Sequence, residues 1–340
     1  MTSDRDVTIY DIAKALDISA STVSRGLKNH PHVRKEMKKK ILITARKMGY
    51  QQNKFASNLR QKHTSTLGVI IPRLDSYFMS SVISGMESIA NQSGYNLIIS
   101  QSQESLRKES ASAATLFNTR VDGILISLSY ETTDLEHLNV IFKKGIPIVF
   151  FDRVCDHPKC KSVVINNLKA GYEATSHLIS KGCKKIVHIG GSQIRNVYSD
   201  RYNGFRQAMA DHNLEVNSGS LIVTDLSQMA GVEVARKMIQ QKNLPDGIFA
   251  SNDTSAVAIV CELKQAGVRI PEDVCVVGFN NDPISRVVEP NLTTINYPGR
   301  EMGEIAAGTL INTLKGQQSD FLNSIVLSHS LIIRQSTLRK

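Results

Sequence analysis

Hydrophobic side chains in the first fifty residues recur every three or four positions, which is the spacing of short amphipathic helices. We predict one helix after Thr8 and a second from Ala20 to Leu27 after Ser19, because Thr and Ser favour the position that caps a helix N-terminus. The same spacing predicts a third helix over 33–49. The side chains expected to face the inside of this three-helix unit are Ile9, Ile12, Ala13, Leu16, Val23, Leu27, Met37, Ile41, Ala45 and Met48.

The first two predicted helices, with the short polar turn between them, have the pattern of a helix-turn-helix. In that motif the second helix carries small and polar side chains at its N-terminal end, where they contact base edges in the major groove. Ala20, Ser21 and Arg25 are expected to face outward here. An ordinary helical hairpin that binds no DNA has the same pattern, so the pattern alone leaves both interpretations open.

Basic charge is concentrated at this end of the chain. Residues 1–65 contain 14 Lys and Arg against 5 Asp and Glu, whereas the remaining residues contain 27 against 26. A local excess of positive charge suits contact with phosphates and salt-dependent binding, rather than general solubility. The charge distribution therefore favours DNA binding.

The segment 51–65 is polar and basic, and its few apolar side chains, Ala56 and Leu59 among them, share one face if it is helical. So short a helix is unstable alone, but it could pair with its copy in a dimer and press Leu59 between bases in the minor groove. A flexible linker explains the composition equally well.

From Thr66 onward the pattern changes to short β-branched runs that alternate with amphipathic helical stretches, such as 79–93 and 253–266. The eight apolar runs predicted as strands are LGVIIP, YNLIIS, DGILIS, IPIVFF, SVVIN, KIVHIGG, GIFASN and VCVVGF. This alternation is typical of parallel sheets covered by helices on both faces. The span is too long for one ordinary sheet, so we predict an α/β core of two lobes.

Polar and aromatic side chains follow several predicted strands. Ligands of such folds bind at the carboxyl ends of strands and, where there are two lobes, between them. Planar hydrogen-bonding groups and aromatic rings suit a polyhydroxylated ligand, although each polar residue could instead cap the helix that follows it. The candidates are Asp75, Tyr77, Phe78, Asp152, Arg153, Asn166, Asn252, Asp253, Asn280 and Asn281.

Other functions find little support in the sequence. The catalytic motifs GxSxG, GxxxxGK[ST] and HExxH do not occur, so we expect no catalytic residues. An enzyme acting on a sugar or nucleoside, with Asp152 or Asp253 as acid or base, is one alternative. Cys155, His157 and Cys160 lack a fourth metal ligand, so we expect no metal, no cofactor and reduced cysteines.

No apolar run is long enough to span a bilayer, and the N-terminus lacks an apolar signal region. We therefore expect a cytoplasmic protein with no membrane partner.

Motifs along nearly the whole chain resemble those of the lac repressor and gal repressor family of bacterial transcription regulators. They are VTIYDIAKALDISASTVSRGL, NKFASNLR, LGVIIP, FFDR, HLISKGCKKIVHIGG, RYNGFRQAM, PDGIFASND, GVRIPEDVCVVGFNNDP, PNLTTINYPGREMG and LIIRQST. The resemblance implies an all-α helix-turn-helix headpiece (1–50), a hinge helix (51–65) and an α/β core like the periplasmic sugar-binding proteins (66–340). The N-lobe is expected at about 66–165 and 294–322, and the C-lobe at about 166–293 and 323–340.

The resemblance also implies a function. We expect a homodimer that binds a palindromic operator in double-stranded DNA, acts as a repressor, and responds to a small effector molecule, a sugar or sugar derivative, held between the lobes. A soluble sugar-binding protein and a regulator controlled by a phosphoprotein are the alternatives. The chain ends soon after LIIRQST without a leucine heptad, so a tetramer like that of the lac repressor is not expected.

Individual residues match positions with known roles in that family. By resemblance, Arg25 is suited to a guanine in the major groove beside Ala20 and Ser21. The residues implied to contact phosphates are Thr8, Tyr10, Ser19 and His32, and those implied at the minor groove are Ala56 and Leu59. The residues implied to contact the effector are Tyr77, Phe78, Asp152, Arg201, Asn252 and Asn281, with Arg201 as the central donor.

The chain departs from the family pattern at three places. Asn166-Asn167 and Asn280-Asn281 stand where the family often has aspartates, so amides that both donate and accept replace groups that only accept. The hydroxyl pattern of the effector is expected to differ accordingly. Gly26 lies inside the predicted recognition helix at a cost of about 1 kcal/mol relative to Ala, which suggests that this helix depends on packing and on DNA.

Overall fold

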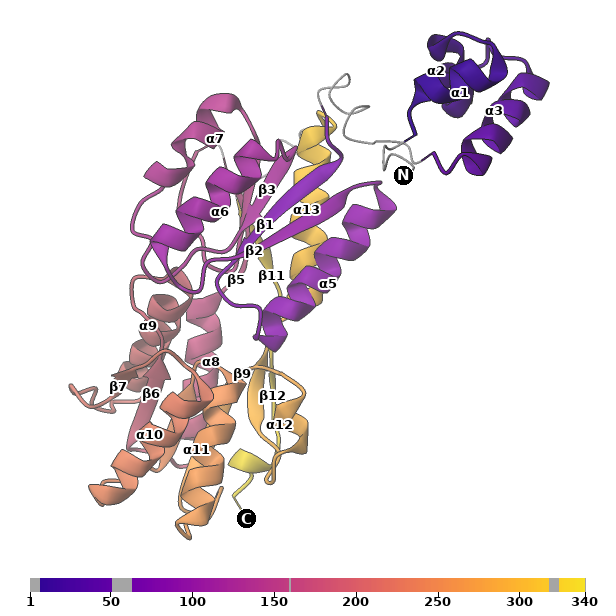
Figure 1. The fold of residues 1–340 in the computed structure, drawn as a ribbon. Coiled ribbons are helices and arrows are strands. Elements are labelled where there is room, and N and C mark those ends of the chain that lie inside the picture. Colours follow the sequence, from indigo (N-terminus) through magenta and orange to yellow (C-terminus); the bar gives the residue numbers. More distant parts are fainter. Residues whose placement is uncertain (1–6, 51–62, 159, 318–323, 340) are drawn as a thin grey trace. The chain divides into compact units, whose positions relative to one another are not determined.

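A computed structural model describes residues 7–50, 63–158, 160–317 and 324–339. The chain divides into two compact units, Met1–Thr64 and Ser65–Lys340, which are described separately (Figure 1). None of the helices in the described ranges is both long and apolar enough to cross a membrane.

The first unit is a bundle of three helices, α1 (Ile9–Leu16), α2 (Ala20–Leu27) and α3 (Lys35–Lys47). The predicted apolar faces do meet in one core, because Ile12, Val23 and Ile41 are fully buried and the other predicted inner residues are buried or pack against them. The Ser19 hydroxyl accepts a hydrogen bond from the backbone N–H of Thr22 at 3.2 Å, as expected of a helix cap.

Gly26 has a packing explanation. It is buried, and a Cβ atom at this position would collide with the end of the Ile41 side chain. The glycine therefore leaves room for Ile41 of α3 against α2, and the prediction that α2 depends on packing agrees with this contact.

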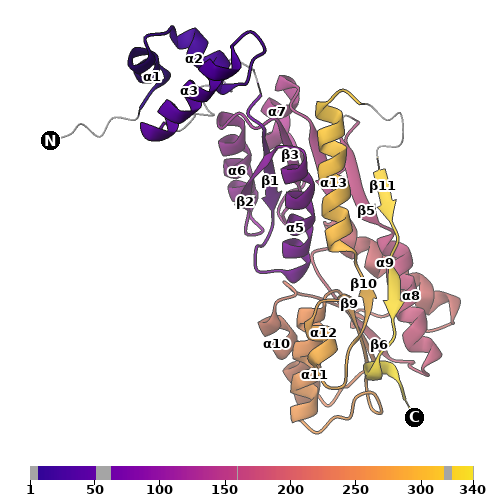
Figure 2. The same cartoon turned by 90° about the vertical axis from the view of Figure 1, so that its right-hand side faces the viewer.

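The core unit contains two six-stranded sheets, one in each lobe (Figures 1 and 2). The N-lobe sheet is wholly parallel and has the strand order β11-β5-β4-β3-β1-β2. Its strands are β1 (Thr66–Ile71), β2 (Asn96–Gln101), β3 (Gly123–Ile126), β4 (Ile148–Phe151), β5 (Lys161–Ile165) and β11 (Ser324–Leu327).

The C-lobe sheet has the order β12-β10-β9-β8-β6-β7 and is parallel except for β12, which pairs antiparallel with β10. Its strands are β6 (Ile186–Gly190), β7 (Leu221–Val223), β8 (Gly247–Ala250), β9 (Cys275–Asn280), β10 (Thr293–Asn296) and β12 (Ser330–Ile332). The predicted α/β fold of two parallel-sheet lobes is confirmed.

Helices cover both faces of each sheet. In the N-lobe, α5 (Tyr77–Gln92) and α13 (Gly299–Leu314) pack together on one face, and α6 (Leu106–Asn118) and α7 (Asn139–Lys144) lie on the other (Figure 2). In the C-lobe, α8 (Asn167–Ser180) pairs with α9 (Asn196–Asp211), and α10 (Gln228–Gln240) pairs with α11 (Asp253–Gln265). The short helices are α12 (Ile284–Val287) and the 3-10 turns η1 (Glu136–Leu138) and η2 (Gln335–Thr337).

The chain passes between the lobes after β5, between β10 and α13, and between β11 and β12. The predicted lobe boundaries after 293 and after 322 were therefore each a few residues too early. β10 extends the C-lobe sheet beside β9, and β11 extends the N-lobe sheet beside β5, before the chain crosses.

Candidate functional site

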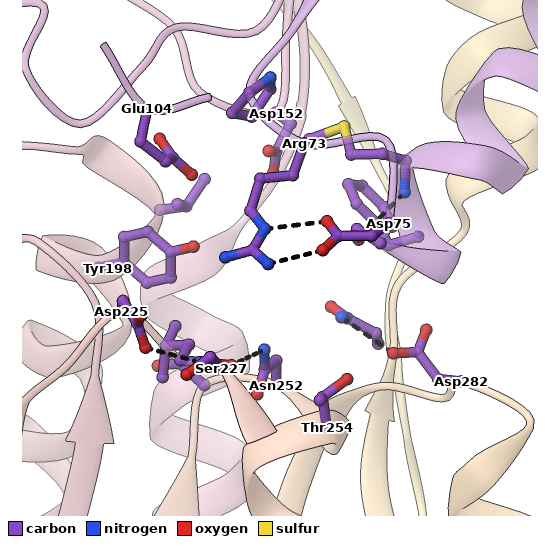
Figure 3. A pocket seen from close by; sticks show the side chains of 18 of the residues that line it. Arg73, Asp75, Glu104, Asp152, Tyr198, Asp225, Ser227, Asn252, Thr254 and Asp282 are labelled. Carbon is purple, nitrogen blue, oxygen red and sulfur yellow. Dashed lines mark hydrogen bonds and ion pairs between the residues drawn. The ribbon is translucent and has the colours of Figure 1, made fainter. Parts of the chain in front are cut away.

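A cavity of about 620 Å³ lies between the two lobes of the core, where the strands of both sheets end (Figure 3). Its walls mix charged, amide, hydroxyl and aromatic side chains from both lobes. The charged residues that line it are Arg73, Arg153, Arg201, Asp75, Glu104, Asp152, Asp225 and Asp282.

Asp152 lies directly after β4 and is almost wholly buried. Its carboxylate accepts hydrogen bonds from the hydroxyls of Tyr297, at 2.8 Å, and Ser127, at 3.3 Å. The backbone of Asp152 has a φ of 58°, in the left-handed region that residues other than glycine rarely adopt. The end of β4 thus places this carboxylate at the cavity wall, where it accepts hydrogen bonds from Tyr297 and Ser127.

Arg153, the next residue, ties the N-lobe to α9 of the C-lobe. Its guanidinium donates to Glu104 at 2.7 Å and to the Tyr198 hydroxyl at 3.0 Å, and it lies 4.4 Å from the centre of the Tyr130 ring. Tyr130 in turn donates to the Tyr198 hydroxyl at 3.2 Å. One side of the cavity is therefore a pre-arranged network of an ion pair and two tyrosines.

Arg201, on α9, is buried in the C-lobe wall. Its guanidinium donates to Asn167 Oδ1 at 2.9 Å and to the carbonyl of Ser251 at 3.0 Å, and it lies 3.5 Å from the centre of the Phe279 ring. Burial lowers the pKa of Arg201, but an arginine stays cationic in proteins. Gly171 of α8 lets this part of α9 approach, because a Cβ there would collide with the backbone of Arg201.

Arg73 and Asp75 form an ion pair in the loop after β1. Two hydrogen bonds, of 2.9 and 2.7 Å, join the guanidinium to the carboxylate, and both side chains are partly exposed. This pairing raises the pKa of Arg73 and lowers that of Asp75, and the charge of Asp225 in the opposite lobe also raises the pKa of Arg73. Arg73 and Asp75 thus differ from Arg153 and Arg201, which are buried.

Four of the six residues implied to contact an effector line this cavity together: Phe78, Asp152, Arg201 and Asn252. Asn252 also caps α11, since its Oδ1 accepts from the backbone N–H of Ser255 at 2.9 Å. Asn252 thus both caps α11 and lines the cavity.

Tyr77 and Asn281 do not line the cavity but a neighbouring depression of about 410 Å³. Tyr77 precedes Phe78 on α5 and is turned outward, with 57% of its surface exposed. The Asn281 side-chain amide donates a hydrogen bond to Asn296 Oδ1 at 2.9 Å and accepts one from Arg334 at 2.6 Å. Neither residue lines the same cavity as Arg201 in this structure, and their contact with an effector stays a prediction.

The other candidate residues from the sequence also divide into those that line the cavity and those that do not. Asp75, Arg153 and Asn280 line the cavity. Asn166 is exposed and caps α8. Asp253 is buried below the cavity, where it accepts from the Thr294 hydroxyl at 2.7 Å, and burial raises its pKa well above the ordinary value.

Several lining residues were not predicted from the sequence. Glu104 follows the predicted strand β2, so the rule that found Asp152 could have found it. Asp225 follows β7, a short strand that the sequence pattern did not reveal. Tyr130 and Tyr198 carry no such signal, because only the tertiary fold brings them together. Tyr297 directly follows β10, a strand that the apolar runs did not reveal. Asp282 follows the asparagines that end β9, one position beyond the pair that was singled out.

The headpiece presents most of the residues implied to contact DNA. Tyr10, Ser21, Arg25 and His32 are exposed, as is Ser19 at the start of α2, and Thr8 is half-buried. Ala20 differs from the prediction: it is half-buried and packs against the headpiece core, so it presents only part of its surface. Ala56 and Leu59 lie outside the described residues.

No group of three or more His, Cys, Asp or Glu in the described ranges is arranged to hold a metal ion. Cys160 contacts His157 through a 3.5 Å S···N approach, and burial raises the pKa of this thiol to about 12. The five cysteines are free thiols.

Two family models match the chain. Residues 8–53 match the bacterial regulatory proteins of the lacI family, and residues 175–337 match the periplasmic binding protein-like domain. The first match contains the three-helix unit, and the second contains most of the C-lobe and the last elements of the N-lobe.

Known proteins resemble the chain over nearly its whole length. Catabolite control protein A of Priestia megaterium is 30% identical over 334 residues, covering 98% of this chain and 99% of that relative. The HTH-type transcriptional repressor PurR of Photobacterium profundum is 31% identical over 329 residues, covering 97% and 98%. A crystal structure of the lac repressor dimer bound to operator and the anti-inducer ONPF shares the fold, with a TM-score of 0.88 at 23% identity and coverage of 98% and 100%.

Proposed function

Since the chain belongs to the lacI family of bacterial regulatory proteins, we propose that a small polar ligand, bound between the lobes of the core, controls its binding to DNA. The protein is a DNA-binding transcriptional regulator whose relatives include repressors. It acts on a palindromic operator as a homodimer, and its effector is a sugar or sugar derivative.

The observation that carries the proposal is the cavity between the lobes. Its volume of about 620 Å³ is in the range of small-molecule sites, and its polar groups converge from both lobes. Arg201 and Asn252 offer hydrogen bonds from the C-lobe, while Asp152 and the ring of Phe78 lie on the N-lobe side. Such a mixture supports a ligand with several hydroxyls and an apolar face.

Ligand binding acts on the contacts that join the lobes. The Asn196 side chain, at the start of α9, accepts from the backbone N–H of Val154 at 3.0 Å and donates to the carbonyl of Asp152 at 3.2 Å. A ligand that touches both lobes favours one arrangement of these contacts over another. It shifts DNA affinity only by its differential affinity for the two arrangements, typically about 1–3 kcal/mol.

We propose that the cavity binds its ligand without transforming it. Asp75, Glu104 and Asp152 each accept a hydrogen bond from a neighbouring side chain, so they are less available as acids or bases. Release of a modified product when the full-length protein is incubated with a bound sugar would contradict this part of the proposal.

The proposal is tested by screening the full-length protein for thermal stabilisation by sugars, sugar phosphates and nucleobases, because a ligand of the folded state raises the melting temperature. Each stabilising compound is then titrated into the complex with an operator selected from random double-stranded DNA. We expect at least one compound to raise the melting temperature and to change the DNA affinity. If no compound does both, ligand control is refuted.

The headpiece assignment is tested by Arg25→Ala. Arg25 is exposed on α2, and loss of a base contact costs about 1–3 kcal/mol, or about five- to 150-fold in operator affinity. Fluorescence anisotropy measures the affinity, and Lys237→Ala, which removes an exposed cation from α10, is the matched control. Thermal stabilisation by a ligand should be the same in both variants; undiminished operator affinity in Arg25→Ala would contradict the assignment.

A further inference from the structure

Asp282 is a carboxylate that the cavity buries without giving it an adequate partner. It lies between β9 and α12, is 5% exposed, and lines the cavity (Figure 3). Its Oδ1 atom has no hydrogen-bond partner among the residues that the structure describes. Its Oδ2 atom accepts only a long bond, of 3.5 Å, from the Asn280 amide.

The backbone of Asp282 is held in place. Its N–H donates to Asp253 Oδ2 at 2.7 Å, and its carbonyl accepts from the Ser285 hydroxyl at 2.6 Å. These bonds fix the point on the backbone from which the carboxylate extends at the cavity wall. A buried carboxylate that lacks a partner reduces the stability of a fold, and residues of that kind are expected where a ligand supplies the missing partner.

The surroundings of Asp282 suit a positively charged group. The rings of Phe78 and Tyr297, stacked with centroids 4.2 Å apart, line the same part of the cavity, and aromatic faces attract cations. The Asn280 amide oxygen adds a neutral acceptor group nearby. These residues form the wall that the cavity shares with the neighbouring depression.

The charged side chains that line the cavity also favour a positively charged ligand group. Three arginines face five carboxylates, which is a formal excess of two negative charges. Arg73 and Arg153 are each committed to a carboxylate partner, at 2.7 Å in both cases. Arg201 donates to the Asn167 amide oxygen and to the Ser251 carbonyl, and in the described part of the chain no hydrogen bond joins it to Asp282.

We propose that the effector carries an amine and that Asp282 binds this amine, while Arg201 and Asn252 bind its oxygen atoms. The ligand class is a polyhydroxylated amine, such as an amino sugar. An ammonium group supplies both the missing hydrogen-bond donor and the missing positive charge, and such charge-assisted bonds are stronger than those from a hydroxyl. The inference rests on the proposed control of DNA binding by a ligand in this cavity.

The test compares three amino sugars with their neutral parents: glucosamine with glucose, galactosamine with galactose, and mannosamine with mannose. Calorimetric titration into the full-length protein at pH 7.5 measures each affinity. At least one amine should bind about tenfold or more tightly than its parent, which corresponds to about 1.4 kcal/mol. The preference should fall to near unity in Asp282→Asn and should persist in Asp211→Asn, a matched change at an exposed position of α9.

Three results would overturn the inference: neutral parents that bind as tightly as the amines, an amine preference that survives in Asp282→Asn, or no binding by any of the six compounds. The proposed function fails separately, when no compound in the wider screen changes operator affinity. A neutral sugar that binds and releases the operator would therefore reject the amine and support the ligand-controlled regulator. The melting temperature of each variant shows that it is folded.

Discussion

At the scale of single residues, the two buried carboxyl groups beneath the cavity differ in how they are satisfied. Asp253 accepts from the Thr294 hydroxyl and from the backbone of Asp282, at 2.7 Å each. Asp282 has no comparable donor in the described part of the chain. Asp253 is therefore hydrogen-bonded within the fold, whereas Asp282 lacks a close hydrogen-bond donor in the described residues.

We expect Asp282→Asn to stabilise the protein at neutral pH. Burial raises the pKa of Asp282 to about 6 from an ordinary 3.8, so the folded state retains a proton that the unfolded chain loses between these values. The contribution of the protonated group to the free energy of unfolding is complete below about pH 4 and is lost as the pH rises through 6. Asparagine carries no charge and avoids this loss. We expect Asp282→Asn to raise the free energy of unfolding by about 1–3 kcal/mol at pH 7.5.

Urea denaturation of the two proteins at pH 7.5 and at pH 4 measures this difference, which should shrink at the lower pH. Asp211→Asn serves as the control, because Asp211 is exposed. A variant less stable than the parent at pH 7.5 would show that the carboxylate is already well partnered in the free protein.

Residue-level prediction worked where a strand end fixes the position of a side chain. Asp152 and Asn252 were found because each follows a long apolar run, and both line the cavity. Tyr198 and Tyr130 were missed because one is on a helix and the other in a loop, and they meet only when the lobes come together. Of the adjacent residues Tyr77 and Phe78, both line the depression but only Phe78 also lines the cavity, which a sequence position alone does not distinguish.

At the scale of elements, close contact between α8 and α9 positions Arg201. Gly171 of α8 lies against the backbone of Arg201, and Gly204 of α9 lies against the backbone of Leu168 and Tyr172, so neither glycine has room for a Cβ. Backbone, unlike the end of a flexible side chain, cannot give way locally. The two helices must separate if either glycine is replaced.

We therefore expect Gly171→Ala to lower the free energy of unfolding by about 1–3 kcal/mol, which is typical of overpacking. Gly308→Ala is the matched control, since this glycine is also inside a helix, α13, but has open space where its Cβ would lie. The control should be unchanged or up to about 1 kcal/mol more stable, because Ala favours a helix over Gly. Equal effects of the two substitutions on chemical denaturation would contradict the packing explanation.

The strands show which elements sequence patterns reveal. The eight predicted apolar runs correspond to β1–β6, β8 and β9. All of these strands except the edge strand β2 contain buried residues, and buried parallel strands need continuous apolar sequence. β7, β10, β11 and β12 are three or four residues long, and β7, β11 and β12 lie at sheet edges. Short edge strands need fewer apolar residues, so their sequences resemble loops and the lobe boundaries could not be set from them.

At the scale of the whole core, the arrangement of the lobes depends on a few contacts from the first turn of α9. Asn196 bonds to the backbone on both sides of Arg153, and Arg195 donates to the carbonyl of Thr132. Tyr198 adds its hydroxyl to the network around Arg153. These contacts join the lobes without occupying the centre of the cavity.

Asn196→Ala should loosen the lobes while leaving each one folded. It removes both hydrogen bonds to the N-lobe backbone, and we expect a loss of about 1–3 kcal/mol in the free energy of unfolding. Small-angle scattering should show a more open core, whereas Asn203→Ala, at an exposed position of the same helix, should leave scattering and stability unchanged. Identical scattering curves for the two variants would contradict this role of Asn196.

The passage of the chain back to the N-lobe through α13 affects how the protein is made. Strands β1–β5 leave the ribosome before the C-lobe, but α13 is synthesised only after nearly the whole C-lobe. Ala306 and Leu310 of α13 pack in the same cluster as Leu125, Val149 and Phe151 of the first sheet. At the usual speed of translation this delay is on the order of 10 seconds. The part of this sheet face that α13 covers beside α5 stays exposed for that time, so we expect the nascent chain to need a chaperone until its last fifty residues emerge.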